Sequence, residues 1–222
     1  MSFIYEFIDQ FGTSFAPQSD LKPWELIAKI TTILEDQIQH LDDNYTVSNG
    51  IAVHKSATVE NGVVLKRPVI IGADCFIGAN AYFRGGVFLG SNSKIGTGCE
   101  IKSSIILNNS NIAHFNFIGD SIIGSNVNFE AGSLTANYYN ERVDKKICVV
   151  YKSEVIDTNI EKFGALVGDN SKIGANAVLS PGTILDKNSV VKRLELIDQI
   201  NQFNNQKYKK GMTKWRHFAK LK

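Results

Sequence analysis

Apolar residues recur at every sixth position through the first half of the chain. The run is continuous from residue 53 to residue 113, and its members are Val53, Val59, Leu65, Ile71, Ile77, Phe83, Leu89, Ile95, Ile101, Leu107 and Ala113. A period of six fits neither an α-helix nor a simple strand alternation. It predicts a hexapeptide solenoid, in which each six-residue unit forms one wall of a triangular coil and three units complete a turn. Residues eighteen apart should then stack at roughly 4.8 Å.

The repeat changes register once and is interrupted once. Ile118 and Ile123 each come five residues after the preceding inward position, so we expect side chains to leave their columns just after Ala113. The repeat is suspended over residues 138–163 and then resumes with Val167, Ile173, Leu179, Leu185 and Val191. An insertion that leaves the phase intact predicts a loop on one wall of the prism, commonly the wall that binds a ligand.

Two amphipathic helices are predicted ahead of the solenoid. The first has apolar residues at helical spacing, namely Phe3, Phe7, Ile8 and Phe11. The second is marked by Asp20 and Pro23, and its stripe consists of Trp24, Ile27, Ile30, Leu34, Ile38 and Leu41. We expect residues 1–48 to cap the first coil, whose open end would expose core and strand edges. A partner-binding arm is the alternative. The solenoid is expected over 49–192, and residues 193–222 should form a weak helix and a basic tail.

The charge distribution, the cysteine content and the N-terminus indicate in which compartment the protein works. The net charge is +2 over 222 residues, but residues 207–222 hold seven cations and no acidic residue, so the remainder carries a net −5. Cys75, Cys99 and Cys148 are odd in number, and two of them fall at inward positions, which predicts small buried residues in a reducing compartment. The N-terminus has no secretory signal and no apolar run reaches 18 residues, so we expect a cytoplasmic protein without a membrane span.

Three cations share one predicted column on the outer surface. Lys66, Arg84 and Lys102 each follow an inward residue and are eighteen residues apart. Like charges one strand apart repel each other unless something neutralises them. The side chains therefore either spread into solvent or bind an anion, and phosphate suits paired cations best.

A second column ends in a histidine. It contains Glu60, Gly78, Gly96 and His114, so two successive glycines should leave a hollow beneath the imidazole. This hollow and the register change that follows favour a functional histidine over a structural one. We expect no metal site, because no other histidine shares the column.

A third column is apolar although it faces outward. Its residues are Ala52, Ile70, Phe88 and Ile106. Such a stripe should be covered, and a flat-sided prism is most easily covered by copies of itself around a threefold axis. We therefore expect a homotrimer. Burial of the stripe under the chain's own loop is the alternative.

Several segments resemble one enzyme family. They are Glu100–Lys102, His114–Asp120, Asn126–Asn128, Ala131–Tyr138 and Phe163–Asn170. They look like the acetyltransferase half of the bifunctional glucosamine-1-phosphate acetyltransferase/N-acetylglucosamine-1-phosphate uridylyltransferase, and the last segment is similar to archaeal-type sugar-phosphate members of that group. The resemblance covers roughly residues 50–192 and includes the register change. It implies a mainly β fold, the left-handed parallel β-helix, and a homotrimer with active sites between subunits.

The resemblance also implies roles for single residues. His114 corresponds to the general base that takes a proton from the sugar amine, a role that contributes about 10²–10⁴ in rate. Arg84 and Lys102 correspond to the cations that hold the sugar phosphate. The residues that would position the sugar and its amine are Asn128, Asn137 and Tyr138, of which Asn137 is grouped with His114 as catalytic.

The chain departs from the family pattern at two site positions. Phe117 stands where the family has a sugar-binding tyrosine, and Val143 stands where a phosphate-binding lysine is usual, with Lys146 as a nearby substitute. The basic tail, with Trp215 and Arg216, corresponds in kind to the arm that meets coenzyme A, since cations suit its phosphates and an indole its adenine. We also expect no uridylyltransferase domain ahead of the solenoid, because residues 1–48 are too short to form one.

The sequence therefore predicts an acetyl-CoA-dependent N-acetyltransferase that acts on an amino sugar phosphate or a nucleotide-linked amino sugar and needs no metal. Two alternatives remain. One is transfer of a longer acyl chain from acyl carrier protein to a UDP-amino sugar, and the other is a catalytically silent trimeric scaffold. We do not expect nucleic acid as a partner, because the basic tail belongs to no recognisable nucleic-acid fold.

Overall fold

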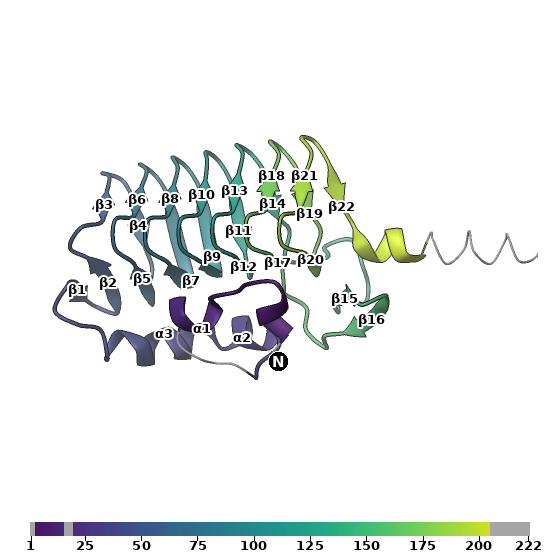
Figure 1. Ribbon diagram of the computed structural model, residues 1–222, viewed down its shortest axis with the longest axis horizontal. Coiled ribbons are helices and arrows are strands. Elements are labelled where there is room, and N and C mark those ends of the chain that lie inside the picture. Colours follow the sequence, from purple (N-terminus) through teal and green to yellow (C-terminus); the bar gives the residue numbers. More distant parts are fainter. Residues whose placement is uncertain (1–2, 16–19, 205–222) are drawn as a thin grey trace, which may run out of the picture.

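The computed structural model describes residues 3–15 and 20–204, and its main body is a three-walled prism of short parallel strands (Figure 1). The first wall, here called wall A, is a seven-stranded sheet. Its strands are β3 (Thr58–Val59), β6 (Phe76–Ile77), β8 (Lys94–Ile95), β10 (Asn111–Ile112), β13 (Asn128–Phe129), β18 (Lys172–Ile173) and β21 (Val190–Val191). The predicted fold class, a mainly β parallel helix built from hexapeptide repeats, is confirmed.

The other two walls form one thirteen-stranded sheet, because β7 (Tyr82–Leu89) and β9 (Glu100–Ile106) run across the corner between them. Wall B contains the first halves of β7 and β9 together with β4 (Val64–Leu65), β11 (Phe117–Gly119), β14 (Leu134–Thr135), β19 (Val178–Leu179) and β22 (Leu196–Ile197). Wall C contains their second halves together with β2 (Ile51–His54), β5 (Val69–Ile71), β12 (Ile122–Ile123), β17 (Ala165–Val167) and β20 (Thr183–Leu185).

The inward residues fill one continuous core along the prism. Ile71, Phe83 and Ile95 are fully buried in it, in line with the six-residue period. Cys75 and Cys99 are buried there as predicted, and the Cys75 thiol donates to the carbonyl oxygen of Gly90 at 3.1 Å. Burial raises the pKa of Cys75 to about 11, so this thiol stays protonated at neutral pH and acts as a small apolar residue.

The register changes in two steps. The second is the predicted five-residue step from Ile118 to Ile123, because Ile123 pairs with Ile106 across a coil of seventeen residues. The first comes earlier than predicted. Val87 pairs with Ser104 and Leu89 with Ile106, so this coil has seventeen residues instead of eighteen. In one coil the corner between walls B and C consists of two glycines, Gly85 and Gly86. In the next coil Ser103 makes this corner alone, with a left-handed backbone at φ +46°. One residue in that conformation turns the chain as sharply as two, so a coil can lose a residue without unstacking. The inward residues that follow are Ile106 and Ile112, and the predictions of Leu107 and Ala113 were wrong.

The N-terminal helices lie along wall C and not over the first coil (Figure 1). They are the 3₁₀ helix η1 (Phe3–Glu6), α1 (Phe11–Ser14), α2 (Pro23–Ala28) and α3 (Ile30–Ile38), so the predicted second helix is broken at Lys29. The expected end cap is therefore wrong, because a long apolar wall offers amphipathic helices more area to bury than the end of one coil. Strand β1 (Tyr45–Ser48), inside the range predicted as helical, closes the edge of wall C by pairing antiparallel with β2.

The outward residues of wall C form one apolar column. In register order they are Ala52, Ile70, Phe88, Ile105, Ile122, Leu166 and Ile184. They pack with Phe11, Trp24 and Leu34 of the N-terminal segment into a second core. The register change puts Ile105, and not the predicted Ile106, in this column. The alternative of burial by the chain itself is confirmed, although helices do the covering, and the stripe no longer supports a homotrimer.

The excursion over residues 138–163 extends this cover. Its hairpin, β15 (Cys148–Tyr151) and β16 (Glu154–Asp157), lies at the C-terminal end of wall C (Figure 1). The rings of Phe3 and Tyr151 are 4.3 Å apart between centroids, and those of Trp24 and Phe163 are 6.0 Å apart. The helices and the hairpin thus form one layer over wall C.

The solenoid runs further than predicted. Strand β22 lies within the segment expected to be helical, and helical residues start only at 199 and continue to 204. The predicted coenzyme A contacts, Trp215 and Arg216, lie outside the described residues. Over the two described ranges, 3–15 and 20–204, every helix is too short or too polar to cross a membrane.

Candidate functional site

A polar hollow of about 460 Å³ opens on wall B, here called the wall B pocket. It is built from strands β7, β9 and β11 and from both ends of the excursion. Its residues are Arg84, Lys102, Phe117, Asn137, Tyr138, Glu161 and Lys162. Five of the predicted site residues therefore meet in one place.

Strand register explains how the pocket forms. Arg84 pairs with Lys102 and Lys102 with Gly119, so the predicted cation column is present and ends in a glycine. A Cβ atom at Gly119 would lie 2.6 Å from the Phe117 ring and 2.8 Å from the Asn137 amide nitrogen. Because real Cβ atoms do not approach that closely, the glycine is what leaves room for this ring and amide at the floor of the pocket.

Two of the three cations of the column, Arg84 and Lys102, have a carboxylate partner. Arg84 Nε lies 2.6 Å from Glu100 Oε1, and Lys102 Nζ pairs with Asp120. The Lys102 and Asp120 side chains are only 15% and 10% exposed, so this pair is the more shielded of the two. The repulsion expected within the column is thus relieved inside the chain, and an anionic ligand would have to join or displace these carboxylates.

His114 lies outside the wall B pocket, at the corner between walls A and B that follows β10. Its side chain is exposed, and its carbonyl oxygen accepts a hydrogen bond from the backbone N–H of Gly132 at 2.9 Å. A Cβ atom at Gly96 would lie 2.9 Å from His114 Nδ1. The imidazole therefore occupies the space that a side chain at Gly96 would need, although the ladder sets Gly96 opposite Ala113 and not opposite His114.

Asn128 also lies apart from the wall B pocket, on wall A. It lines a groove of about 470 Å³, here called the wall A groove, together with Glu130, Lys172, Gly174, Lys192, Arg193 and neighbouring apolar residues. Glu130 accepts two hydrogen bonds from the Arg193 guanidinium, at 2.8 and 2.7 Å, and this contact holds the pKa of Glu130 below its usual value. Lys172 and Lys192 leave the groove with exposed positive charge.

Comparison with known proteins agrees with this architecture. A family model described as the hexapeptide repeat of succinyl-transferase matches residues 68–102 and 164–192. The bifunctional protein GlmU of Methanococcus vannielii is 32% identical over 195 residues, which cover 85% of this chain and 46% of that protein. This chain belongs to the hexapeptide-repeat acyltransferases. The resemblance seen in its motifs is confirmed.

A second relative of this acyltransferase is the bifunctional sugar-1-phosphate nucleotidylyltransferase/acetyltransferase of Sulfurisphaera tokodaii. It is 32% identical over 166 residues, covering 72% of this chain and 41% of that protein. The chain thus spans about half the length of the curated relatives it matches. Among solved structures, a perosamine N-acetyltransferase mutant from Caulobacter crescentus, bound to coenzyme A and GDP-perosamine, overlaps with a TM-score of 0.30 at 16% identity, over 64% of this chain and 53% of that one. That likeness is too low to support an argument about function.

Two residues of the wall B pocket were not predicted from the sequence. Lys162 and Glu161 line it, whereas Lys146, predicted to replace the lysine missing at Val143, is exposed and does not. The excursion has no repeat period, so its sequence does not indicate which of its lysines lines the pocket. Asp120 did carry a signal, since it comes eighteen residues after Lys102, although the shortened coil sets Gly119 and not Asp120 opposite Lys102.

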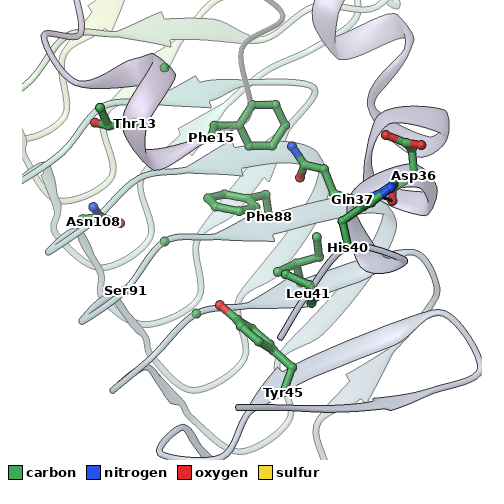
Figure 2. A pocket seen from close by; sticks show the side chains of 14 residues that line it. Thr13, Phe15, Asp36, Gln37, His40, Leu41, Tyr45, Phe88, Ser91 and Asn108 are labelled. Carbon is green, nitrogen blue, oxygen red and sulfur yellow. Dashed lines mark hydrogen bonds between the residues drawn. The ribbon is translucent and has the colours of Figure 1, made fainter. Parts of the chain in front are cut away.

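A separate hollow of about 500 Å³ lies between the N-terminal helices and wall C (Figure 2). Phe15, Gln37, His40, Tyr45 and Phe88 are among its residues, and none of the predicted site residues line it. Within residues 3–15 and 20–204, no three His, Cys, Asp or Glu side chains are placed to share a metal ion. The expectation that acyl transfer here needs no metal remains a prediction.

Proposed function

We propose that this acyltransferase transfers an acetyl group from acetyl-CoA to the amine of an amino sugar phosphate or a nucleotide-linked amino sugar. The wall B pocket carries the proposal, because it joins cations suited to a phosphate with an amide and aromatic rings suited to a sugar. Two relatives support it by name, since one is called a sugar-1-phosphate nucleotidylyltransferase/acetyltransferase and the other GlmU.

Each residue of the pocket would bind one part of the acceptor. Arg84 and Lys102 would hold the phosphate, with Lys162 as the third cation in place of the predicted Lys146. The Phe117 ring offers an apolar face to the sugar without the hydroxyl of a tyrosine. Tyr138 would close the side of the pocket. Lys145 Nζ lies 4.7 Å from the centroid of its ring.

The chemical step needs a neutral amine and a base. The amine nitrogen attacks the thioester carbonyl carbon, a C–N bond forms and the C–S bond breaks. His114 would take the proton that the amine loses and return it to the departing coenzyme A thiolate. Its side chain is exposed, so a bound substrate can reach the ring nitrogens.

The donor would lie along wall A. Lys172 and Lys192 of the wall A groove could pair with the phosphates of coenzyme A, and Asn128 of β13 lies in the same groove. The predicted contacts from Trp215 and Arg216 would add to this site.

The functional unit that we propose is a cytoplasmic homotrimer. His114 and the wall B pocket lie at opposite edges of wall B, separated by about 3.3 Å for each residue of the strand between them. Walls A and B also carry exposed outward residues, unlike wall C. A neighbouring copy packed on the open walls would bring its own corner histidine toward the pocket. Sedimentation should then give three times the 24.5 kDa of one chain.

A thiol-release assay tests the function. Acetyl-CoA is incubated with glucosamine-1-phosphate, with a UDP-amino sugar and with free glucosamine, and coenzyme A is measured as a free thiol. We expect release with a phosphorylated amino sugar and much less with free glucosamine, which lacks the phosphate. Release only from an acylated carrier protein would favour the longer-chain alternative. Coenzyme A binding without turnover of any donor would identify a scaffold and refute the proposal.

A further inference from the structure

Asp120 does not line the wall B pocket, but its carboxylate contacts two side chains that do, Lys102 and Asn137. It follows β11 at the corner between walls B and C, and its side chain is 10% exposed. Its Oδ2 atom accepts hydrogen bonds from both Lys102 Nζ and Asn137 Nδ2. A single carboxylate oxygen therefore fixes the distance between a cation and an amide that both line the pocket.

The backbone holds Asp120 on both sides. Its N–H donates to the carbonyl oxygen of Lys102 at 2.8 Å, and its own carbonyl oxygen accepts from the N–H of Gly164 at 2.9 Å. The residue is left-handed at φ +47° because it makes the corner between walls B and C on its own, as Ser103 does one coil earlier at φ +46°. The corner and the two backbone hydrogen bonds together fix the position of the Asp120 backbone.

The contact with Asp120 decides which way the Asn137 amide points. An ionised carboxylate can only accept hydrogen bonds, so the NH₂ group of Asn137 must face Asp120. The amide oxygen then faces away from Asp120, toward the pocket that Asn137 lines. An acceptor amine placed there meets an oxygen to which its N–H can donate, and its lone pair stays available for attack.

The opposite amide orientation would be unproductive. An NH₂ group facing the ligand would donate to the lone pair of the amine, which is the electron pair that must attack the thioester. We propose that Asp120 is a positioning residue that keeps Asn137 in the productive orientation and holds Lys102 at the same time. This inference rests on the proposed N-acetyltransferase activity and names a residue that supports it.

A charge swap tests the inference on the full-length protein. Asp120→Asn has the same shape but lets the Asn137 amide adopt either orientation, so we expect kcat to fall about tenfold to a hundredfold with KM unchanged or lower. In the double variant Asp120→Asn with Asn137→Asp, the new amide can donate to the new carboxylate, which again presents an oxygen to the amine. We expect the double variant to exceed each single variant by about tenfold.

The Asn137→Asp variant alone gives an independent readout, and it is useful if Asp120→Asn does not fold. Two adjacent carboxylates repel, and one takes a proton as the pH falls. When the introduced carboxyl group carries that proton, it resembles the native amide, because it donates to Asp120 and presents its other oxygen to the amine. The activity of this variant relative to wild type at each pH should therefore rise toward lower pH, which a purely structural role would not produce.

The control is Asp169→Asn. Asp169 is also a buried carboxylate, 5% exposed, but it accepts from the backbone N–H groups of Asp9 and Ser125, away from the pocket. We expect it to lower stability and leave kcat and KM of the folded protein unchanged. Wild-type kcat in Asp120→Asn, or a double variant no better than the poorer single variant, would overturn the role of Asp120 alone. A wild-type protein without turnover on any amino sugar would overturn the proposed function as well.

Discussion

Wall C and wall A are built from the same six-residue repeat but differ in what their outward residues do. On wall C these residues are apolar, and the helices and the hairpin bury them in a second core. On wall A every outward residue is exposed, and the column reads Thr58, Phe76, Lys94, Asn111, Asn128, Lys172 and Val190. The inward positions thus determine the prism, and the outward positions determine whether a wall is covered by the rest of the chain or left exposed.

The polar contacts follow the same division. On the covered side, buried Asp169 ties the N-terminal segment to the coils, through the N–H groups of Asp9 and Ser125 at 2.9 and 2.7 Å. On wall A, Glu60 accepts from the N–H of Ala79 at 2.7 Å in an exposed position. A hydrogen bond shielded from water is costlier to lose than an exposed one. Changes on the covered wall should therefore act on folding, and changes at the open corners on activity.

His114→Ala should give the largest effect of this kind. Removal of the base should lower kcat about 10²- to 10⁴-fold. The side chain is exposed at an open corner, so the free energy of unfolding should stay within about 0.5 kcal/mol of wild type. Thiol-release kinetics and urea denaturation on one preparation measure both. Full activity would remove His114 as the base, and a loss of stability of similar size would break the division between walls.

Trp24→Ala is the counterpart on the covered wall. Trp24 is 2% exposed and packs its ring edge-on against Phe163, so its loss should lower the free energy of unfolding by about 3–5 kcal/mol. Phe76→Ala on wall A is the matched control, because that ring is 36% exposed, and it should cost well under half as much. Denaturation midpoints compare the two variants. Equal costs would mean that wall A is buried as deeply as wall C, as in a tightly packed assembly.

The sequence predicted the prism well because its inward period is strict. A single run of aliphatic residues determined the walls, the buried Cys75 and Cys99, and the place of the excursion. It also brought Arg84 and Lys102 into one column, which the strand register confirms. Periodicity is a local property of the sequence, so it can be recognised without knowing which segments pack against the outer surface of the prism.

What the sequence did not reveal depends on contacts between distant segments. Nothing in residues 3–38 states which apolar surface they will cover, so the helices were assigned to the end of the prism instead of wall C. Lys162 lines the pocket because the excursion ends close to the place where it begins. The sequence of a loop does not indicate where the loop rejoins the solenoid. The single-residue corners at Ser103 and Asp120 each shorten a coil by one residue, and the first of them explains the errors at Ile106, Leu107 and Ala113.

The smallest expected effect is a stabilisation at the open corner beside His114. Phe115 has a left-handed backbone at φ +56°, whereas the coils on either side have Gly98 and Gly132 at the same corner, at +69° and +72°. Its ring is 71% exposed, so it gains little from packing that could offset this strain. Phe115→Gly should raise the free energy of unfolding by about 0.5–1 kcal/mol, which corresponds to about 1–4 °C in Tm for a chain of this size.

Leu194→Gly is the matched variant for this prediction, because Leu194 is also left-handed, at φ +59°, and 79% exposed. Scanning calorimetry of both variants, together with thiol release, separates strain from function. Stabilisation of both with activity lost only in Phe115→Gly would mean that the strained aromatic ring is kept for the site around His114. Destabilisation by Phe115→Gly alone would instead mean that its ring is buried against a neighbouring copy, so that this corner of the open walls belongs to an interface.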